Sequence, residues 1–327
     1  MKQRMLGKTG VMVSEIALGC WQLGAVWGEP FNPEIALNTL KTATSQGINC
    51  LDTADVYMGG ESERAIGRYL QTLDEKPFVI TKMGRFQSPH IAAGYHEDNL
   101  RRFVKQSLKN LQVDALDMVL LHCPPSEVYD TPEVFESLDI IKADGLIKHY
   151  GVSVETVEEG LNAIQYPGVE AIEIIFNMFR LKPAEHFFLE AKKQNVGIIV
   201  RVPLASGLLT GKFKKDTQFN PNDHRTYNRQ GEKFDMGETF SGVDYNTGLE
   251  AVEALKKVFP NESLPRIALR WILMFDAVST VIPGASRPEQ ILENAKASLL
   301  PPLTEAQMKQ VEAIYNQYIR PLVHHKW

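Results

Sequence analysis

Four side chains with complementary acid–base chemistry follow short apolar runs of the sequence. The run ending in LDTADVY has Asp52 at its end and Tyr57 in the loop after it. The run VITKMG places Lys82 at a second strand end, and VLLHCPP places His122 at a third. A tyrosine has an ordinary pKa of about 10, and a nearby ammonium lowers that pKa because it stabilises the phenolate. The four residue types therefore indicate a proton-transfer site with Tyr57 as the proton donor.

The other three residues support Tyr57 in this hypothesis. Lys82 would lower the pKa of Tyr57, and Asp52 would keep the ammonium charged and oriented, because a buried ammonium is costly unless it is paired. His122 would donate a hydrogen bond to a substrate carbonyl oxygen. Each residue taken alone also has a structural interpretation: a turn cap for Asp52, a solvated Lys82 and a hydrogen-bonded structural His122. Their recurrence at successive strand ends favours the functional interpretation.

Apolar runs alternate with amphipathic stretches along most of the chain. Apolar residues at three- and four-residue spacing predict helices such as Pro33 to Gln46, Glu97 to Asn110, Pro132 to Ala143 and Ala184 to Gln194. The strands predicted between the helices are Ile16 to Gly19, Ile48 to Asp52, Phe78 to Lys82, Met118 to His122, His149 to Ser153, Ala171 to Phe176, Gly197 to Val202 and Ser279 to Pro283. This repeat predicts an α/β fold, a closed (β/α)8 TIM barrel, with residues 1–327 as one domain.

A doubly wound fold is the alternative for such an alternation. It needs a GxGxxG phosphate loop after the first strand, where this chain reads GCWQLGAVWGEP. Outside the repeat, Met5 to Ser14 predicts a hairpin that plugs one end of the barrel. The long polar stretch Lys214 to Tyr245 predicts a lid. Thr304 to Arg320 predicts an extra C-terminal helix, and the tail PLVHHKW is expected to fold over the mouth of the site.

Composition and charge exclude several classes of partner. The 327 residues carry 35 Lys and Arg against 40 Asp and Glu, without the basic face that nucleic acid requires. We expect no membrane association, because the chain has neither an apolar run of about 20 residues nor a signal peptide. The three cysteines lack CxxC spacing, so we expect reduced thiols, no metal site and a cytoplasmic protein. The adjacent His324 and His325 are expected to be solvated.

The sequence closely resembles the aldo/keto reductase family, in particular its bacterial NADP-dependent oxidoreductases. The resemblance runs from KTGVMVSEIALGCWQLG to IPGASRPEQILENAKA, nearly the whole chain. It implies that Asp52, Tyr57, Lys82 and His122 are the catalytic tetrad of this family. It also implies reduction of aldehydes and ketones with NADP(H), in which Tyr57 is the general acid.

The same resemblance implies where the cofactor binds. VPLASGLLTGKF (Val202 to Phe213) would cradle the pyrophosphate with backbone N–H groups and Lys212. GASRPEQILEN (Gly284 to Asn294) would bind the 2′-phosphate at a helix N-terminus and the adenine one turn later. Without the resemblance, this segment is an ordinary helix with Ser286 as its N-cap. The implied cofactor-binding residues are Gly19, Trp21, Ser153, Glu173, Arg201, Pro203, Leu204, Ser206, Gly207, Leu209, Lys212, Arg225, Gly284, Ser286, Arg287, Gln290 and Asn294.

Several of these positions depart from the family pattern. Gly284 and Gln290 stand where some relatives have a Lys and an Arg, so that Arg287 alone would carry most of the recognition of the 2′-phosphate. Glu173 replaces a Gln that holds the carboxamide, and Val154 follows Ser153 where the family often has Asn. Arg201 stands where many relatives stack a Tyr under the nicotinamide, and a guanidinium can also stack on a ring. These departures affect the redox poise and direction of the reaction.

The substrate pocket and the lid have candidate residues of their own, and the function has two alternatives. The expected pocket residues are Trp21, Trp27, Phe86 and Cys123, and the lid residues expected to close on the phosphates are His224, Arg225 and Arg229. One alternative function is a sugar or polyol dehydrogenase that works in the oxidative direction. The other is a redox-sensing regulatory subunit, because this scaffold also serves in potassium-channel β subunits. The small-molecule carbonyl or alcohol substrate and the oligomeric state stay open.

Overall fold

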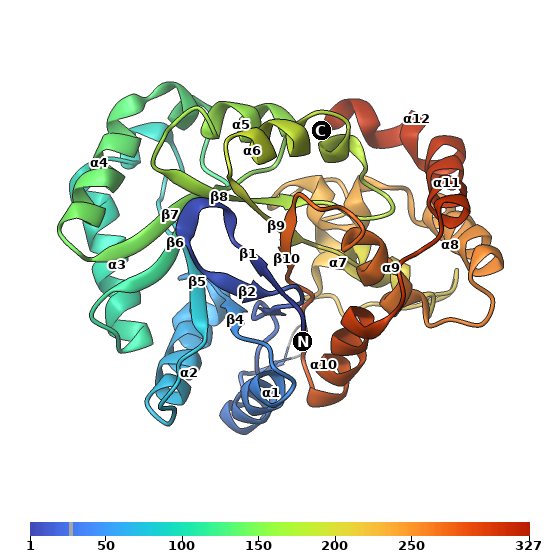
Figure 1. Ribbon diagram of the computed structural model, residues 1–327, viewed down its shortest axis with the longest axis horizontal. Coiled ribbons are helices and arrows are strands. Elements are labelled where there is room, and N and C mark those ends of the chain that lie inside the picture. The colour runs from blue at the N-terminus through green and yellow to red at the C-terminus, as the bar shows by residue number, and fades with distance from the viewer. Residues whose placement is uncertain (26–28) are drawn as a thin grey trace.

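Eight parallel strands form the centre of the molecule. The computed structural model describes residues 1–25 and 29–327, and the strands lie in the order β10-β9-β8-β7-β6-β5-β4-β3 (Figure 1). Bridges from Ile16 to Val281 and from Gly19 to Gly284 join the first strand to the last, so the sheet closes. The predicted (β/α)8 barrel is confirmed. The strands are β3 (Leu18–Gly19), β4 (Cys50–Asp52), β5 (Phe78–Met83), β6 (Leu116–His122), β7 (Ile147–Ser153), β8 (Val169–Ile175), β9 (Gly197–Arg201) and β10 (Val278–Val281).

Helices surround the strands (Figure 1). They are α1 (Pro33–Ser45), α2 (Glu61–Leu70), α3 (Glu97–Leu111), α4 (Pro132–Ala143), α5 (Val157–Ala163), α6 (Phe187–Lys193), α7 (His224–Tyr227), α8 (Tyr245–Val258), α9 (Leu264–Ile272), α10 (Pro288–Ala295), α11 (Glu305–Ile314) and α12 (Arg320–Val323). Helix α4 has the predicted bounds, and α1 and α3 end within one residue of them. Helix α6 begins later than predicted because Lys182–Ala184 form a separate 3-10 turn.

Local caps explain where several helices begin. Asn32 accepts hydrogen bonds from the backbone N–H groups of Glu34 and Ile35, and Pro33 fits the first helical position of α1. The predicted C-terminal helix is α11, which begins with a capping box between Thr304 and Gln307. It then continues through a π-helical turn, Tyr315–Ile319, into α12. No helix in residues 1–25 or 29–327 has the length and apolar composition needed to cross a membrane.

The barrel strands face two apolar layers. Met118 and Leu120 of β6 belong to an inner cluster, whereas Val119 and Leu121 belong to the outer core under the helices. This alternation follows from the two-residue period of a strand. The inner cluster consists of Leu6, Val13, Ala17, Cys50, Ile80, Met118, Leu120, Ala171, Ile199 and Ile282. The barrel interior is therefore packed with side chains, not open as a channel.

The N-terminal hairpin plugs one end of the barrel. Strands β1 (Gln3–Met5) and β2 (Met12–Ser14) pair antiparallel, and Leu6, directly after β1, and Val13 of β2 are fully buried. In Figure 1 the hairpin, in dark blue, lies across the centre of the ring of strands. Gly7 packs against the backbone of Gly197 at the start of β9, so the plugged end is the amino end of the strands. The carboxyl ends remain for a functional site.

Gly7 gives a test of this plug. A methyl group on Gly7, where φ is +54°, would lie 2.3 Å from Gly197 N, whereas nothing lies within 4 Å of one on Gly10, where φ is +76°. We expect Gly10→Ala to lower the free energy of unfolding by about 1 kcal/mol through backbone strain alone. Gly7→Ala should lose about 2 kcal/mol more, because the clash overpacks the plug. Urea denaturation of both variants measures the difference, and equal losses would contradict close packing at Gly7.

Candidate active site

A cavity of about 590 Å³ opens at the carboxyl ends of the strands. The last residues of several strands form part of its wall: Gly19 of β3, Asp52 of β4, His122 of β6, Ser153 of β7 and Arg201 of β9. The stretch Lys214 to Tyr245, predicted as a lid, runs from the segment after β9 to the first residue of α8 and contains α7 and the 3-10 turns Met236–Glu238 and Phe240–Gly242. His224, Arg225, Tyr227, Phe234 and Glu238 of this lid also line the cavity. The cavity therefore lies where α/β barrels carry their active sites.

A hydrogen-bonded series of side chains lies against this wall. Lys82 Nζ donates to Asp52 Oδ1 at 2.6 Å, to the Thr53 carbonyl oxygen at 3.0 Å and to Tyr57 Oη at 3.3 Å. Lys82 has no exposed surface, whereas Asp52 and Tyr57 line the cavity. The ammonium therefore reaches the phenol from within the protein. A substrate in the cavity would meet the phenol, not the ammonium.

Burial sets the direction of the pKa shifts in this series. Burial acts against the charged form of Lys82, but the carboxyl groups of Asp52 and Glu173 outweigh it and raise the pKa of Lys82 well above its ordinary value. Burial also raises the pKa of Tyr57, and Lys82 only partly opposes this rise. The expectation that Lys82 brings the pKa of Tyr57 below its ordinary value is therefore wrong. The neutral phenol prevails, which is the form that can donate a proton.

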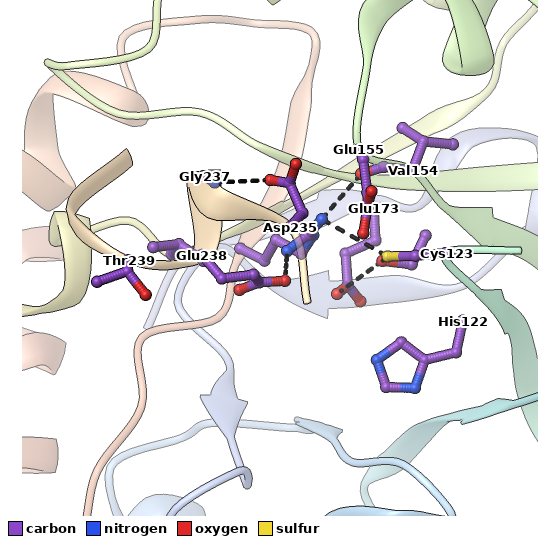
Figure 2. Close-up of polar contacts among 12 residues, drawn as sticks. His122, Cys123, Val154, Glu155, Glu173, Asp235, Gly237, Glu238 and Thr239 are labelled. Atoms are coloured by element: carbon purple, nitrogen blue, oxygen red, sulfur yellow. Dashed lines mark hydrogen bonds and ion pairs between the residues drawn. The ribbon is translucent and has the colours of Figure 1, made fainter. Parts of the chain in front are cut away.

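His122 lies beside Tyr57 as a neutral imidazole. Burial, followed by the positive charges of Arg85 and Lys82, lowers the pKa of His122 well below its ordinary value. Its Nδ1 has no hydrogen-bond partner among the described residues. Its ring centroid lies 5.8 Å from that of Tyr57, and Figure 2 shows the ring apart from the dashed contacts around it. A neutral imidazole next to the phenol can donate one N–H to a carbonyl oxygen.

Glu173 and Arg201 form the adjacent wall. Glu173 Oε2 lies 3.4 Å from Lys82 Nζ, and Oε1 accepts a hydrogen bond of 3.3 Å from Ser153 Oγ. Arg201 donates to the carboxylate of Glu238 in the lid, and to the Val154 carbonyl oxygen at 2.9 Å. The Arg201 guanidinium therefore connects the barrel to its lid.

A second part of the cavity wall is cationic. It includes Lys212, Arg225 and Arg287, which come from the segment after β9, from α7 and from the start of α10. Asp223 holds Arg225 with a hydrogen bond of 2.9 Å. Within residues 1–25 and 29–327, no carboxylate pairs with the Lys212 ammonium or the Arg287 guanidinium. Two such cations in one cavity, with Arg287 at the N-cap of α10, suit an anionic group such as a phosphate.

Most of the predicted cofactor-binding residues line this cavity. They are Gly19, Trp21, Ser153, Glu173, Arg201, Pro203, Leu204, Ser206, Gly207, Lys212, Arg225, Gly284, Arg287 and Gln290. Leu209 does not, because its side chain is fully buried in the outer core. Asn294 is also buried and outside the wall. Ser286 bonds to Gln290 Oε1 through its backbone N–H, and it is Arg287, not Ser286, that occupies the N-cap of α10.

The other expected residues divide between the cavity and the rest of the protein. Trp21 and His224 line the cavity, and Cys123, buried beside it, accepts a hydrogen bond from Arg201 at 3.6 Å. Trp27 lies outside the described residues. Phe86 is 54% exposed and does not line the cavity. Arg229 does not line it either and lies over the Tyr245 ring.

The C-terminal tail packs behind the lid instead of over the mouth. Trp327 is almost fully buried, and the Arg180 guanidinium lies 3.8 Å from its ring centroid. A methyl group on Gly242 of the lid would lie 2.8 Å from the Trp327 ring. No described residue after Gln290 lines the cavity, so the expectation for the tail is wrong. The tail supports the lid.

Two charged residues of the described cavity wall were missed from the sequence. Arg85 lines the cavity, and its Nε donates to the His122 carbonyl oxygen at 3.2 Å. The strand-end rule that found Lys82 would have found Arg85, because β5 ends at Met83. Glu238 also lines the cavity and pairs with Arg201. No sequence signal points to Glu238, because the lid has no periodicity that fixes which side chains face inward.

The fold and the site define an α/β barrel protein with Tyr57, His122 and several cationic side chains around one cavity. Residues 15–316 match the Aldo/keto reductase family, and the chain belongs to that family. It is 30% identical to the uncharacterized oxidoreductase YqkF of Bacillus subtilis (strain 168), over 98% of each chain. It is 27% identical to the NADH-specific methylglyoxal reductase of Escherichia coli (strain K12), over 91% of this chain and 93% of the relative. The structure of the glycerol dehydrogenase AKR11B4 from Gluconobacter oxydans matches with 26% identity and a TM-score of 0.78, over 98% of this chain and 96% of the other.

Proposed function

We propose that this protein is an NADP(H)-dependent oxidoreductase that reduces aldehydes or ketones to alcohols, with Tyr57 as the general acid. The observation that carries the proposal is the series from Asp52 through Lys82 to Tyr57 at the wall of a cavity that also has a cationic part. Membership of the aldo/keto reductase family supports the reaction class. The cationic wall supports a cofactor with phosphate groups.

The cavity wall fits a nicotinamide dinucleotide. Lys212, Arg225 and Arg287 would hold its phosphates. Near Tyr57, Glu173 Oε2 and Arg201 Nε are buried atoms without hydrogen-bond partners among the described residues. A methyl group on Gly19 would lie 2.7 Å from the Ile282 carbonyl oxygen, so a side chain at this position would disturb the cavity floor. When bound, the cofactor supplies or accepts a hydride.

The residues of the chain would handle the proton. His122 donates a hydrogen bond to the substrate carbonyl oxygen and places it beside Tyr57 Oη. Tyr57 gives its proton to that oxygen as negative charge develops on it. The Lys82 ammonium then stabilises the phenolate, so it acts most strongly late in the proton transfer. Asp52 keeps Lys82 charged and oriented, and in the reverse direction the phenolate takes the alcohol proton.

The proposal is tested by following NADPH consumption over a panel of aliphatic and aromatic aldehydes and ketones. Reduction of NADP⁺ with polyols is measured alongside. Turnover of carbonyl compounds with NADPH supports a reductase. Polyol oxidation with little carbonyl reduction at neutral pH would favour a dehydrogenase, the second candidate, which the resemblance to a glycerol dehydrogenase supports. Cofactor binding without any turnover would favour a redox-sensing subunit, and no binding of either cofactor form would refute the proposal.

Arg287 gives a test of cofactor choice. Its guanidinium has no carboxylate partner within the described part of the chain, and it lines the cavity at the N-cap of α10. We expect Arg287→Ala to weaken NADPH binding by about tenfold to a hundredfold, because a charge-assisted contact with the 2′-phosphate is lost. NADH lacks that phosphate, so its binding should change little. Fluorescence titration gives both dissociation constants.

The matched control is Arg266→Ala. Arg266 donates to Glu293 Oε2 at 2.8 Å, which links α9 to α10 outside the cavity. This variant should bind both cofactors like the wild type. Equal weakening of NADPH and NADH in Arg287→Ala would remove Arg287 from recognition of the 2′-phosphate. A wild type that prefers NADH, like the Escherichia coli relative, would lead to the same conclusion.

A further inference from the structure

Carboxyl groups outnumber cations in the ion pairs near Tyr57. Three cations of the site each have their own carboxylate: Lys82 with Asp52 at 2.6 Å, Arg85 with Glu155 at 3.2 Å, and Arg201 with Glu238. Glu173 is a fourth carboxylate, and its ion-pair partner is Lys82 at 3.4 Å, which Asp52 already holds more closely. Glu173 is therefore a carboxyl group that has no cation of its own.

The surroundings of Glu173 compensate a negative charge there only in part. The Arg201 guanidinium acts on Glu173 electrostatically but pairs with Glu238, and burial together with Glu173 raises the pKa of Asp52, because the two carboxyl groups share the Lys82 ammonium. His122 is held neutral by the low pKa described above. Ser153 gives Oε1 a neutral hydrogen bond of 3.3 Å. Oε2 is buried, has no hydrogen-bond partner among the described residues, and belongs to a side chain that is 2% exposed and lines the cavity. Asp52 and Glu173 therefore share one ammonium, and Glu173 presents its unpartnered oxygen to the cavity beside Tyr57.

A buried, uncompensated carboxylate destabilises its surroundings, and a positive charge on a ligand relieves that cost. The cofactor in the proposed function carries such a charge in one redox form only. The nicotinamide ring of NADP⁺ is a cation, and that of NADPH is neutral. The ring has to lie beside Tyr57, because hydride and proton reach the two ends of one carbonyl bond. Glu173 lies beside Tyr57 through its contact with Lys82.

We propose that Glu173 is the counter-charge of the oxidised nicotinamide and makes this site favour NADP⁺ over NADPH. The inference rests on the proposed function and specifies its direction. Tighter binding of NADP⁺ makes the bound cofactor a poorer oxidant. It stabilises the oxidised cofactor, which forms when NADPH reduces a carbonyl compound. A tenfold change in the ratio of the two dissociation constants corresponds to about 30 mV in the potential of the bound cofactor. Glu173 thereby shifts the potential in the direction that helps the cofactor give up its hydride.

The test compares Glu173→Gln with the wild type in binding, without turnover. Dissociation constants of NADP⁺ and NADPH are measured by fluorescence titration at one pH and one ionic strength. The variant should weaken NADP⁺ relative to NADPH by about tenfold, the size expected for one partly screened charge at close range. Glu173→Asp keeps the charge and should keep the wild-type preference more closely. An unchanged ratio in a folded Glu173→Gln protein would overturn the inference.

The matched control is Glu170→Gln on the same strand. Glu170 pairs with His149 at 2.5 Å and with Lys142 at 2.8 Å, and it lies outside the cavity. Its ratio of dissociation constants should equal that of the wild type, and a shift as large as that of Glu173→Gln would overturn the inference. The wild type alone gives a further check. If it binds NADPH tenfold more tightly than NADP⁺, the inference about Glu173 is also overturned. A wild type that binds neither form would refute the proposed function as well, so the two failures are distinguishable.

Discussion

Tyr57→Phe should reduce carbonyl turnover by about a thousandfold while cofactor binding stays close to that of the wild type. The substitution removes only the hydroxyl that lies 3.3 Å from Lys82 Nζ. General acid catalysis contributes roughly 10² to 10⁴ in rate, and no other described group that lines the cavity holds a transferable proton in the same position. The measurement is kcat for the best aldehyde of the panel, together with the dissociation constant of NADPH.

The pH profile separates this role from a structural one. Burial raises the pKa of Tyr57, so the phenol stays protonated at neutral pH and reduction needs no change of its charge. Oxidation needs the phenolate as base, so the rate of alcohol oxidation should rise with pH through the alkaline range. Tyr57→Phe should lose that rise along with the rate.

Tyr69→Phe is the matched control for the lost hydroxyl. Tyr69 lies in α2 outside the cavity, where its hydroxyl is 2.5 Å from Thr44 Oγ1. This variant should change the melting temperature by a few degrees at most and leave kcat within about twofold. If Tyr57→Phe keeps a tenth or more of the wild-type rate and the same pH profile, Tyr57 is not the general acid.

The positions of the catalytic candidates follow from rules that the sequence carries. Apolar runs with Asp52, Lys82 and His122 at their ends are enough to place these side chains at one edge of a parallel barrel, because every strand points the same way. The hairpin could also be predicted from a local pattern, because two short runs of alternating apolar and polar residues joined by a turn are typical of a β-hairpin. Such local patterns also fixed the bounds of α4.

The direction of the pKa shift at Tyr57 could not be predicted in this way. Sequence spacing gives the neighbour, Lys82, but not the burial that outweighs it. That burial depends on side chains from distant parts of the chain. Trp21, for example, stacks on the Tyr57 ring, with 6.1 Å between the ring centroids.

The lid is a second feature that the sequence could not predict, because Glu238 reaches Arg201 from a loop without periodicity. Leu209 is a third, because a turn with positive φ at Ser206 decides which side chains face the core.

Lys82→Met should destabilise the protein as well as stop catalysis. The substitution removes the cation that lies 2.6 Å from Asp52 and 3.4 Å from Glu173 and leaves both carboxyl groups buried. Removing one partner of a buried ion pair lowers the free energy of unfolding by about 3 to 5 kcal/mol. Lys148→Met is the matched control. Its pair with Asp117 is 58% exposed at the lysine, so the loss should stay below about 1 kcal/mol.

The pH dependence of this loss identifies its cause. Without Lys82, the pKa of Asp52, already raised by burial and by Glu173, rises further, because the positive charge that lowered it is gone. The folded variant then binds protons more tightly than the unfolded chain, so its stability increases as the pH falls. Urea denaturation of Lys82→Met should therefore show a larger loss in the free energy of unfolding at pH 8 than at pH 5. The double variant Lys82→Met/Asp52→Asn should regain stability without regaining turnover. A loss that is equal at both pH values and persists in the double variant would indicate a packing defect instead of two unpaired carboxylates.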